Sequence, residues 1–153
     1  MPTLTTLYFD QLEYSDDAAF QFAAGIPGFE EHTAFLFIQQ PHTNPLVFMQ
    51  SLQDPAVCFI GLPAKVVDSD YHLELSPEEA IALGMPAGET SRIEANLLSL
   101  VLLTFAENTE PVANLMSPIV LNLQTHRGIQ AIQLGSSYSL RHPLVLEQAA
   151  ACS

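Results

Sequence analysis

Hydrophobic residues along this chain fall into short runs that turn signals separate. Continuous apolar runs of strand length occupy residues 34–38, 46–49 and 57–62, and such runs are typical of buried strands. Eleven prolines and seven glycines divide the chain into short pieces, because both residue types interrupt regular structure. Many short strands with turns between them favour a small antiparallel barrel or sandwich.

Other segments carry a weaker strand signal. Residues 71–75 alternate between apolar and polar side chains, so they predict a strand with one solvated face. Residues 7–14 are rich in strand-forming side chains with looser alternation, and residues 20–22 continue that pattern. The apolar stretch 97–105 fits either a helix or a strand, and its β-branched and aromatic residues favour a strand over the second half.

The C-terminal third contains a predicted hairpin. An apolar run at 119–123 is followed by His126-Arg127-Gly128 and then by the cleanly alternating residues 128–134. Two strand-like segments with a short polar connection are typical of antiparallel neighbours. We therefore expect the second segment to return alongside the first.

One helix start is well marked. Ser76 is a favoured N-cap residue, Pro77 suits the first helical position, and the pair Glu78-Glu79 complements the helix dipole. Gly84 provides a stop. These signals predict a helix over residues 77–83, which is short against the average of about 11 residues.

The segment Gly25-Ile26-Pro27-Gly28-Phe29 predicts a tight turn. Proline suits the second position of a type II turn and glycine the third, where the backbone needs a positive φ. A phosphate-binding loop is the competing interpretation of two glycines so close together. The segment lacks the Lys and the Ser or Thr of such a loop, and its proline removes a backbone donor. We therefore expect a turn.

Together these patterns predict a mainly β protein with a small antiparallel β-barrel-like fold and one short helix. A chain of 153 residues with 48% hydrophobic residues is long enough for one domain with a real core. We expect the β domain to span residues 1–144 and residues 145–153 to form a flexible C-terminal tail.

Charge is the most unusual property of the whole chain. Seventeen acidic residues face four basic ones, which gives a formal net charge of −13. Nucleic acids and anionic membrane surfaces attract cationic proteins, so neither is an expected partner, whereas a basic protein would be attracted. The competing interpretation is that the charge serves solubility alone. Sixteen of the acids lie in residues 1–110, and residues 111–153 are nearly neutral.

The cysteine content and the N-terminal sequence indicate in which cellular compartment the protein is expected. Cys58 lies in an apolar run, as expected of a buried free thiol, and Cys152 sits beside the C-terminus. The N-terminus lacks a basic segment followed by an apolar one, so no secretory signal is expected. The longest apolar window, 97–106, is too short to span a bilayer. We expect a cytoplasmic protein.

The chain lacks the residue patterns that are typical of metal sites and hydrolases. The five histidines are scattered without a zinc-ligand spacing, no Gly-x-Ser-x-Gly elbow is present, and the acidic pairs stand where turns and helix starts are expected. No cofactor, metal or catalytic residue is predicted. The remaining alternative is a small acidic β-barrel enzyme or ligand carrier with a pocket around His72, Glu74 and His142.

Four phrases occur in order along the chain. They are Gly25-Ile26-Pro27-Gly28-Phe29-Glu30, Gln50-Ser51-Leu52 before Asp54, Asn114-Leu115 with Pro118-Ile119-Val120-Leu121-Asn122, and Tyr138-Ser139-Leu140-Arg141-His142-Pro143-Leu144. As an ordered set covering residues 5–144, they resemble the FliW family of flagellar assembly factors. The resemblance implies a small β-barrel-like fold and a regulatory role without catalysis.

The resemblance also implies two partners. Proteins of this family bind flagellin and the translational repressor CsrA, and flagellin export frees the factor to bind CsrA. An acidic chain agrees with this, because CsrA-type proteins are RNA binders with basic surfaces. We expect an acidic face for CsrA and an apolar C-terminal face for flagellin. The candidate partner-binding residues are Asp16, Asp17, Glu30, Glu31, Asn114, Asn122, Arg141 and His142. For the two asparagines, a structural bond to nearby backbone is the favoured alternative.

Overall fold

The computed structural model describes residues 3–4, 12–14, 16–85, 97–105, 110–133 and 137–144. The longer strands are β4 (Ala34–Ile38), β5 (Val47–Ser51), β6 (Cys58–Pro63), β7 (Leu97–Thr104), β9 (Ile119–Asn122) and β10 (Arg127–Gln130). The short strands are β1 (Thr3–Leu4), β2 (Leu12–Glu13), β3 (Phe20–Gln21), β8 (Val112–Ala113) and β11 (His142–Pro143). The helical elements are the 3-10 helix η1 (Asp16–Ala18), α1 (Ala64–Val67) and α2 (Pro77–Ala82).

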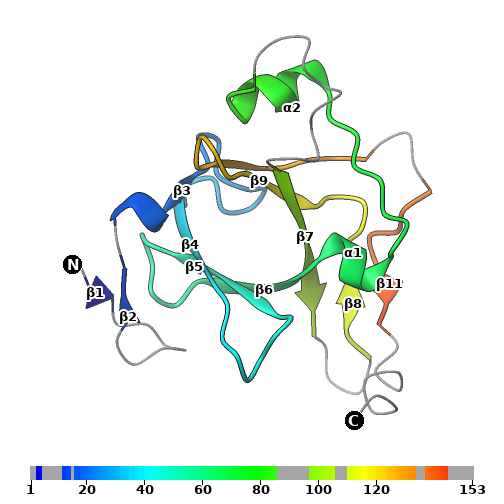
Figure 1. The fold of residues 1–153 in the computed structure, drawn as a ribbon, viewed down its shortest axis with the longest axis horizontal. Coiled ribbons are helices and arrows are strands. Elements are labelled where there is room, and N and C mark those ends of the chain that lie inside the picture. Colours follow the sequence, from blue (N-terminus) through cyan, green and yellow to red (C-terminus); the bar gives the residue numbers. More distant parts are fainter. Residues whose placement is uncertain are drawn as a thin grey trace.

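Seven strands close into a barrel (Figure 1). The order around the ring is β7-β6-β5-β4-β3-β10-β9, and β9 pairs back with β7. Strands β8 and β11 extend the sheet from β7, while β1 and β2 pair with each other. The predicted mainly β barrel is confirmed.

The barrel is largely antiparallel, as predicted, but one junction of the ring is parallel, so the sheet is mixed. Strand β3 runs parallel to β10, with Gln21 opposite Arg127, and the other six junctions of the ring are antiparallel. A closed ring with an odd number of strands needs at least one parallel pair, because directions cannot alternate all the way round. This junction is short, with a single paired position.

Aromatic and aliphatic side chains from facing strands fill the barrel. Phe22 and Phe35 are fully buried at its centre, 5.2 Å apart between ring centroids in an edge-on arrangement that aromatic pairs favour. The remaining buried members of this core are Phe20, Ile26, Val47, Met49, Leu100, Ile119 and Leu121. Gly128 of β10 permits this packing, because a Cβ there would collide with the Phe22 ring.

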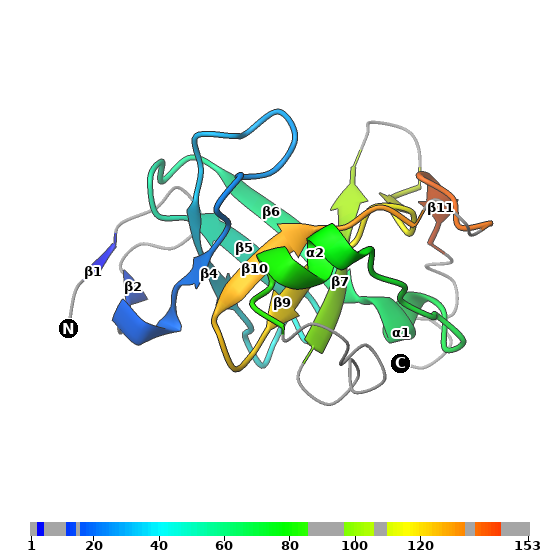
Figure 2. The same ribbon diagram turned by 90° about the horizontal axis from the view of Figure 1, so that it is seen from above.

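Two smaller hydrophobic clusters lie outside the ring. One joins α1 to β7 and β8, with Ala64, Val101 and Ala113 among its members. The other lies at the end of α2, where Leu83 packs against Val120 and Ala131. Figure 2 shows α2 lying across the outer side of β9 and β10.

Most predicted elements are confirmed, with shifted ends. The runs at 34–38, 46–49 and 57–62 form the neighbouring strands β4, β5 and β6, and residues 20–21 form β3. The ambiguous stretch at 97–105 is a strand over nearly its whole length. The structure also confirms the β9–β10 hairpin, the helix after Ser76 and the type II turn after Gly25.

The strand predicted at 71–75 is wrong. This segment joins no sheet. Its polar groups bond to side chains instead: the His72 amide donates to the Tyr138 hydroxyl and the Glu74 amide to Oε1 of Gln133, both at 2.8 Å. The Gln133 Nε2 donates back to the Glu74 carbonyl at 2.7 Å. A side-chain amide thus satisfies the groups that a neighbouring strand would pair.

The number of helices also differs from the prediction. Besides α2, the short helix α1 follows β6 directly, and no side chain caps its N-terminus at Pro63. A four-residue helix without a capping side chain leaves no sequence signal. The proposed tail at 145–153 and most of the 7–14 segment lie outside the described residues.

Candidate functional site

A groove opens on the outside of the barrel where β3 and β10 diverge. It has a volume of about 440 Å³ and lies between the turn after β3, the helix α2 and the strand β10. The acids Glu30, Glu78 and Glu79 line it, and no Lys or Arg is among the described lining residues. We call it the acidic groove. The small and apolar residues between the acids are Ala23, Ala24, Gly25, Pro27, Ala82 and Ile129.

The turn after β3 positions the first of these acids. Gly28 has a φ of 86°, and the Phe29 amide donates to the Ile26 carbonyl at 2.8 Å, as a type II turn requires. The Gly28 amide then donates to Oε2 of Glu30 at 2.7 Å. This bond fixes the Glu30 carboxylate beside the turn, where it lines the groove.

Helix α2 supplies the other two acids. Ser76 and Glu79 form a capping box, in which the Glu79 amide donates to the Ser76 hydroxyl at 3.1 Å and the Ser76 amide to Oε1 of Glu79 at 2.8 Å. The other oxygen of Glu79 accepts a bond from the Ile132 amide at 2.9 Å, just beyond β10. Glu79 therefore ties the helix to the barrel, while Glu78 is exposed.

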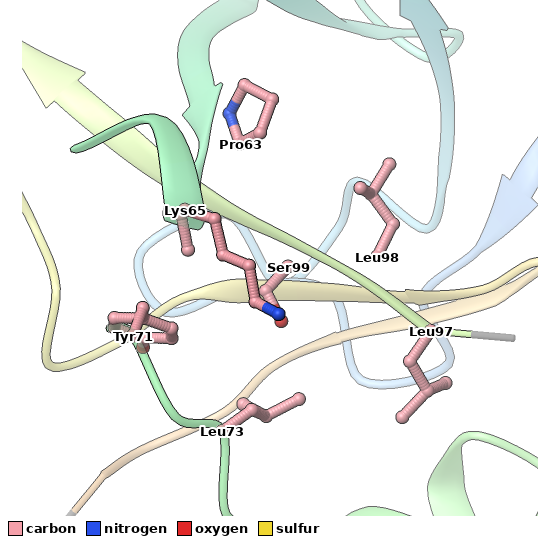
Figure 3. A pocket seen from close by; sticks show the side chains of 8 residues that line it. Pro63, Lys65, Tyr71, Leu73, Leu97, Leu98 and Ser99 are labelled. Carbon is pink, nitrogen blue, oxygen red and sulfur yellow. The ribbon is translucent and has the colours of Figure 1, made fainter. Parts of the chain in front are cut away.

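A second pocket, of about 270 Å³, lies between α1 and the start of β7 (Figure 3). Lys65 reaches toward Ser99 across walls formed by leucines and Tyr71. The Tyr71 hydroxyl donates to the Leu115 carbonyl at 2.8 Å, and burial, with a smaller contribution from the Tyr138 phenol, raises the pKa of Tyr71. The pocket is smaller than the roughly 300–1,000 Å³ of typical ligand sites.

The predicted acidic contacts lie on either side of β3 along the chain. Asp16 begins η1, and Asp17 is exposed one residue later. Glu30 and Glu31 are both exposed in the turn after β3, and Glu30 lines the acidic groove. The structure thus brings Glu30 together with Glu78 and Glu79.

The two predicted asparagines bond to backbone. Asn122 is only 4% exposed; its Nδ2 donates to the Leu83 carbonyl at 2.9 Å, and its Oδ1 accepts from the Gln124 amide at 2.9 Å. Asn114 accepts from the Ser117 amide at 2.9 Å through its Oδ1. Asn122 thereby joins the end of α2 to the β9–β10 turn, and Asn114 closes a turn before β9.

Arg141 and His142 lie at the edge of the extended sheet. His142 pairs with Ala113 in the β11–β8 ladder, and Arg141 is exposed beside it, with its amide bonded to the Ser139 hydroxyl at 3.0 Å. The neighbouring Leu140 is 54% exposed. A basic group and an apolar group therefore share this edge.

The alternative pocket around His72, Glu74 and His142 is not supported. None of these residues lines either of the two pockets above. Among the described residues, no three His, Cys, Asp or Glu side chains gather closely enough to hold a metal ion. No helix in the described part of the chain is long and apolar enough to cross a membrane.

Comparison with known proteins identifies the family. The family model described as FliW protein matches residues 3–144. The chain belongs to the FliW family. A flagellar assembly factor FliW from Syntrophomonas wolfei is 31% identical over 134 residues, which cover 88% of this chain and 83% of that protein. One from Thermotoga sp. strain RQ2 is 34% identical over 135 residues, with coverage of 88% and 87%.

A solved structure agrees with this assignment. The crystal structure of the flagellar assembly factor FliW superposes with a TM-score of 0.82 at 26% identity, covering 96% of this chain and 99% of that one. FliW proteins are non-enzymatic flagellar assembly factors, so the enzyme alternative is excluded.

Sequence reasoning missed part of the FliW chain's acidic groove. The sequence predicts only that Glu78 and Glu79 complement a helix dipole. It does not predict that residues of β10 line a groove. Glu30 and the α2 acids are distant in sequence, and the closing of the barrel brings them together. The proline-glycine turn and the capped helix were the local signals that could have placed them.

Proposed function

We propose that this protein is a cytoplasmic regulatory binding protein of flagellar assembly. It binds flagellin and, when flagellin is exported, binds the translational repressor CsrA and relieves repression. Membership of the FliW family supports the assembly role. The observation that carries the choice of CsrA is the net charge of −13, with an acidic groove on the barrel.

The physical basis of CsrA binding is electrostatic. A protein that binds RNA presents basic side chains to phosphates, and a strongly acidic surface attracts those same side chains. Opposite charges steer the two proteins together and raise the association rate constant. The same field repels RNA.

Flagellin binding uses a different surface in this proposal. The near-neutral C-terminal part offers exposed apolar side chains, Ile132 and Leu140, each at least 50% exposed. Apolar contacts depend on buried area and little on ionic strength. The two partners are therefore distinguished by how salt affects their binding.

Isothermal titration calorimetry with the cognate flagellin and CsrA tests the proposal. We expect both to bind, and raising the salt concentration from 50 to roughly 300 mM to weaken CsrA binding more than flagellin binding, because salt screens exposed charges. No binding of either protein at micromolar concentration would reject the proposed function. Equal salt dependence would reject the electrostatic basis of CsrA binding.

A further inference from the structure

Alternate residues of β10 direct their backbone groups toward β9 and away from it. Just beyond β10, the Ala131 amide donates to the Pro118 carbonyl at 2.9 Å and the Gln133 amide to the Met116 carbonyl at 2.8 Å. In the register of this antiparallel hairpin, odd-numbered residues therefore bond across to β9. The even-numbered residues of β10 direct their N–H and C=O groups to the opposite edge, which faces the acidic groove.

Both ends of that edge are already bonded. At one end the Gln21 amide donates to the His126 carbonyl at 2.8 Å, and the parallel pairing of Gln21 with Arg127 uses the Gly128 N–H. At the other end the Ile132 N–H donates to Glu79 at 2.9 Å. Between them lie the Gly128 carbonyl and both the N–H and the carbonyl of Gln130. None of these three groups has a hydrogen bond to any residue that the structure describes.

The gap exists because β3 leaves β10 early. The chain turns directly after Phe22, where the Gly25 amide donates to the Phe22 carbonyl at 2.8 Å. Residues 23–25 then form the far wall of the acidic groove, and Gly128, Ile129 and Gln130 form the near wall. The place that a longer β3 would occupy is open to a partner.

We propose that the acidic groove binds an extended, basic segment of CsrA by strand addition to β10. The segment continues the line of β3, accepts a bond from the Gln130 N–H and donates one to the Gly128 carbonyl. A Lys or Arg side chain of the segment contacts the carboxylates of Glu30 and Glu78. Backbone pairing gives such a contact affinity, and side-chain charges give it specificity.

Charge selects this occupant among extended peptides. Three carboxylates line the groove without a basic side chain among its described lining residues, so an acidic or neutral segment gains nothing from them. The small side chains of Ala23 and Ala24 leave room for a backbone to approach β10. This inference rests on the proposed binding of CsrA, and it adds the site and the mode of contact.

Two substitutions of Gln130 distinguish the contribution of its backbone N–H to CsrA binding from that of its side chain. Gln130→Pro removes the N–H that faces the groove, but no bond to β9, because Gln130 and Ile119 are a non-hydrogen-bonded pair. Gln130→Ala is the matched control, since both variants lose the bond from Nε2 to the Ser117 carbonyl. By calorimetry we expect Gln130→Pro to weaken CsrA binding about tenfold relative to Gln130→Ala. Equal affinity of the two variants would overturn the inference.

Hydrogen exchange on the unaltered protein gives a second readout. We expect CsrA to protect the Gln130 amide from exchange while the Ile132 amide, which is already bonded, changes little. Flagellin is the control ligand and should leave the Gln130 amide unprotected. Absence of protection by CsrA, or protection by flagellin instead, would overturn the inference even if the proline variant failed to fold.

Binding measurements distinguish a wrong partner from a wrong binding site. If the unaltered protein does not bind CsrA, the proposed function is rejected and the inference with it. If it binds CsrA but neither Gln130→Pro nor the double variant Glu30→Gln, Glu78→Gln weakens binding, the proposed function stands and the groove is the wrong site.

Discussion

Single side chains replace backbone partners at several places in this barrel. Gln133 is 3% exposed and bonds to both polar backbone groups of Glu74, at 2.8 and 2.7 Å. In this way one amide side chain holds the segment after α1 against the barrel. Buried polar groups that lose a partner carry a large free-energy cost.

Replacement of Gln133 tests how much this contact contributes. We expect Gln133→Leu to lower the free energy of unfolding by about 2–3 kcal/mol, because it leaves two backbone groups of Glu74 without partners. Urea unfolding followed by circular dichroism measures this. Gln39→Leu, at an exposed glutamine, is the control and should change stability by less than about 0.5 kcal/mol. Similar values for both variants would contradict the bridging role.

The thiol of Cys58 is expected to react slowly. The prediction of a free thiol is confirmed, although it is only partly buried, and desolvation raises its pKa to about 11. The thiolate is the reactive form, so modification by iodoacetamide at pH 8 should be slower than for an unfolded control in urea. Because the folded pKa lies above the unfolded one, stability should stay constant up to about pH 9 and fall from there toward pH 11. Equal modification rates in the folded and unfolded protein would contradict this.

Helix α2 is short and depends on its N-terminus. With only six residues, it forms few intrahelical bonds, and the capping box satisfies two amides that would otherwise lack partners. The same Glu79 holds the helix on the barrel through Ile132. The position of two groove acids thus depends on one cap.

Loss of the cap should weaken both the helix and the groove. We expect Ser76→Ala to lower the free energy of unfolding by about 1 kcal/mol, and Ser76→Thr, which keeps the hydroxyl, to recover most of that loss. Hydrogen exchange should also show faster exchange of the Ile132 amide in Ser76→Ala. An unchanged Ile132 amide would mean that Glu79 is held without the capping box.

Local sequence signals predicted individual turns and helices, whereas contacts between residues distant in sequence determine which segments pair and where the groove forms. The turn after Gly25 and the helix after Ser76 follow from residues next to each other in sequence. The strand predicted at 71–75 fails because Gln133, far along the chain, takes the place of a neighbouring strand. Local signals predicted the turn that carries Glu30 and the helix that carries Glu78, but not the groove between them, because the two acids come to one groove only after β3 and β10 close the ring.

The net charge of the whole molecule and the positions of individual acids are two different ways in which charge can favour CsrA binding. A net charge of −13 attracts any basic partner over distances near the Debye length. A docking face, in contrast, needs its acids at defined places. The expected division between an acidic face for CsrA and an apolar C-terminal face for flagellin requires acids at defined places, not only a large net charge.

Charge reversal at two sets of acids distinguishes long-range attraction by the net charge from binding to acids at defined positions. The test set is Asp16, Asp17, Glu30 and Glu31, each changed to Lys, and the control set is Asp54, Asp70, Glu74 and Glu110, which changes the net charge equally. A defined face predicts that the test set weakens CsrA binding at least tenfold more than the control set, while flagellin binding changes little in either. Because Glu30→Lys also removes the bond from the Gly28 amide, Glu30→Gln is included to isolate the charge. Equal weakening of CsrA binding by both sets would show that long-range attraction dominates, and loss of flagellin binding in the test set alone would refute separate faces.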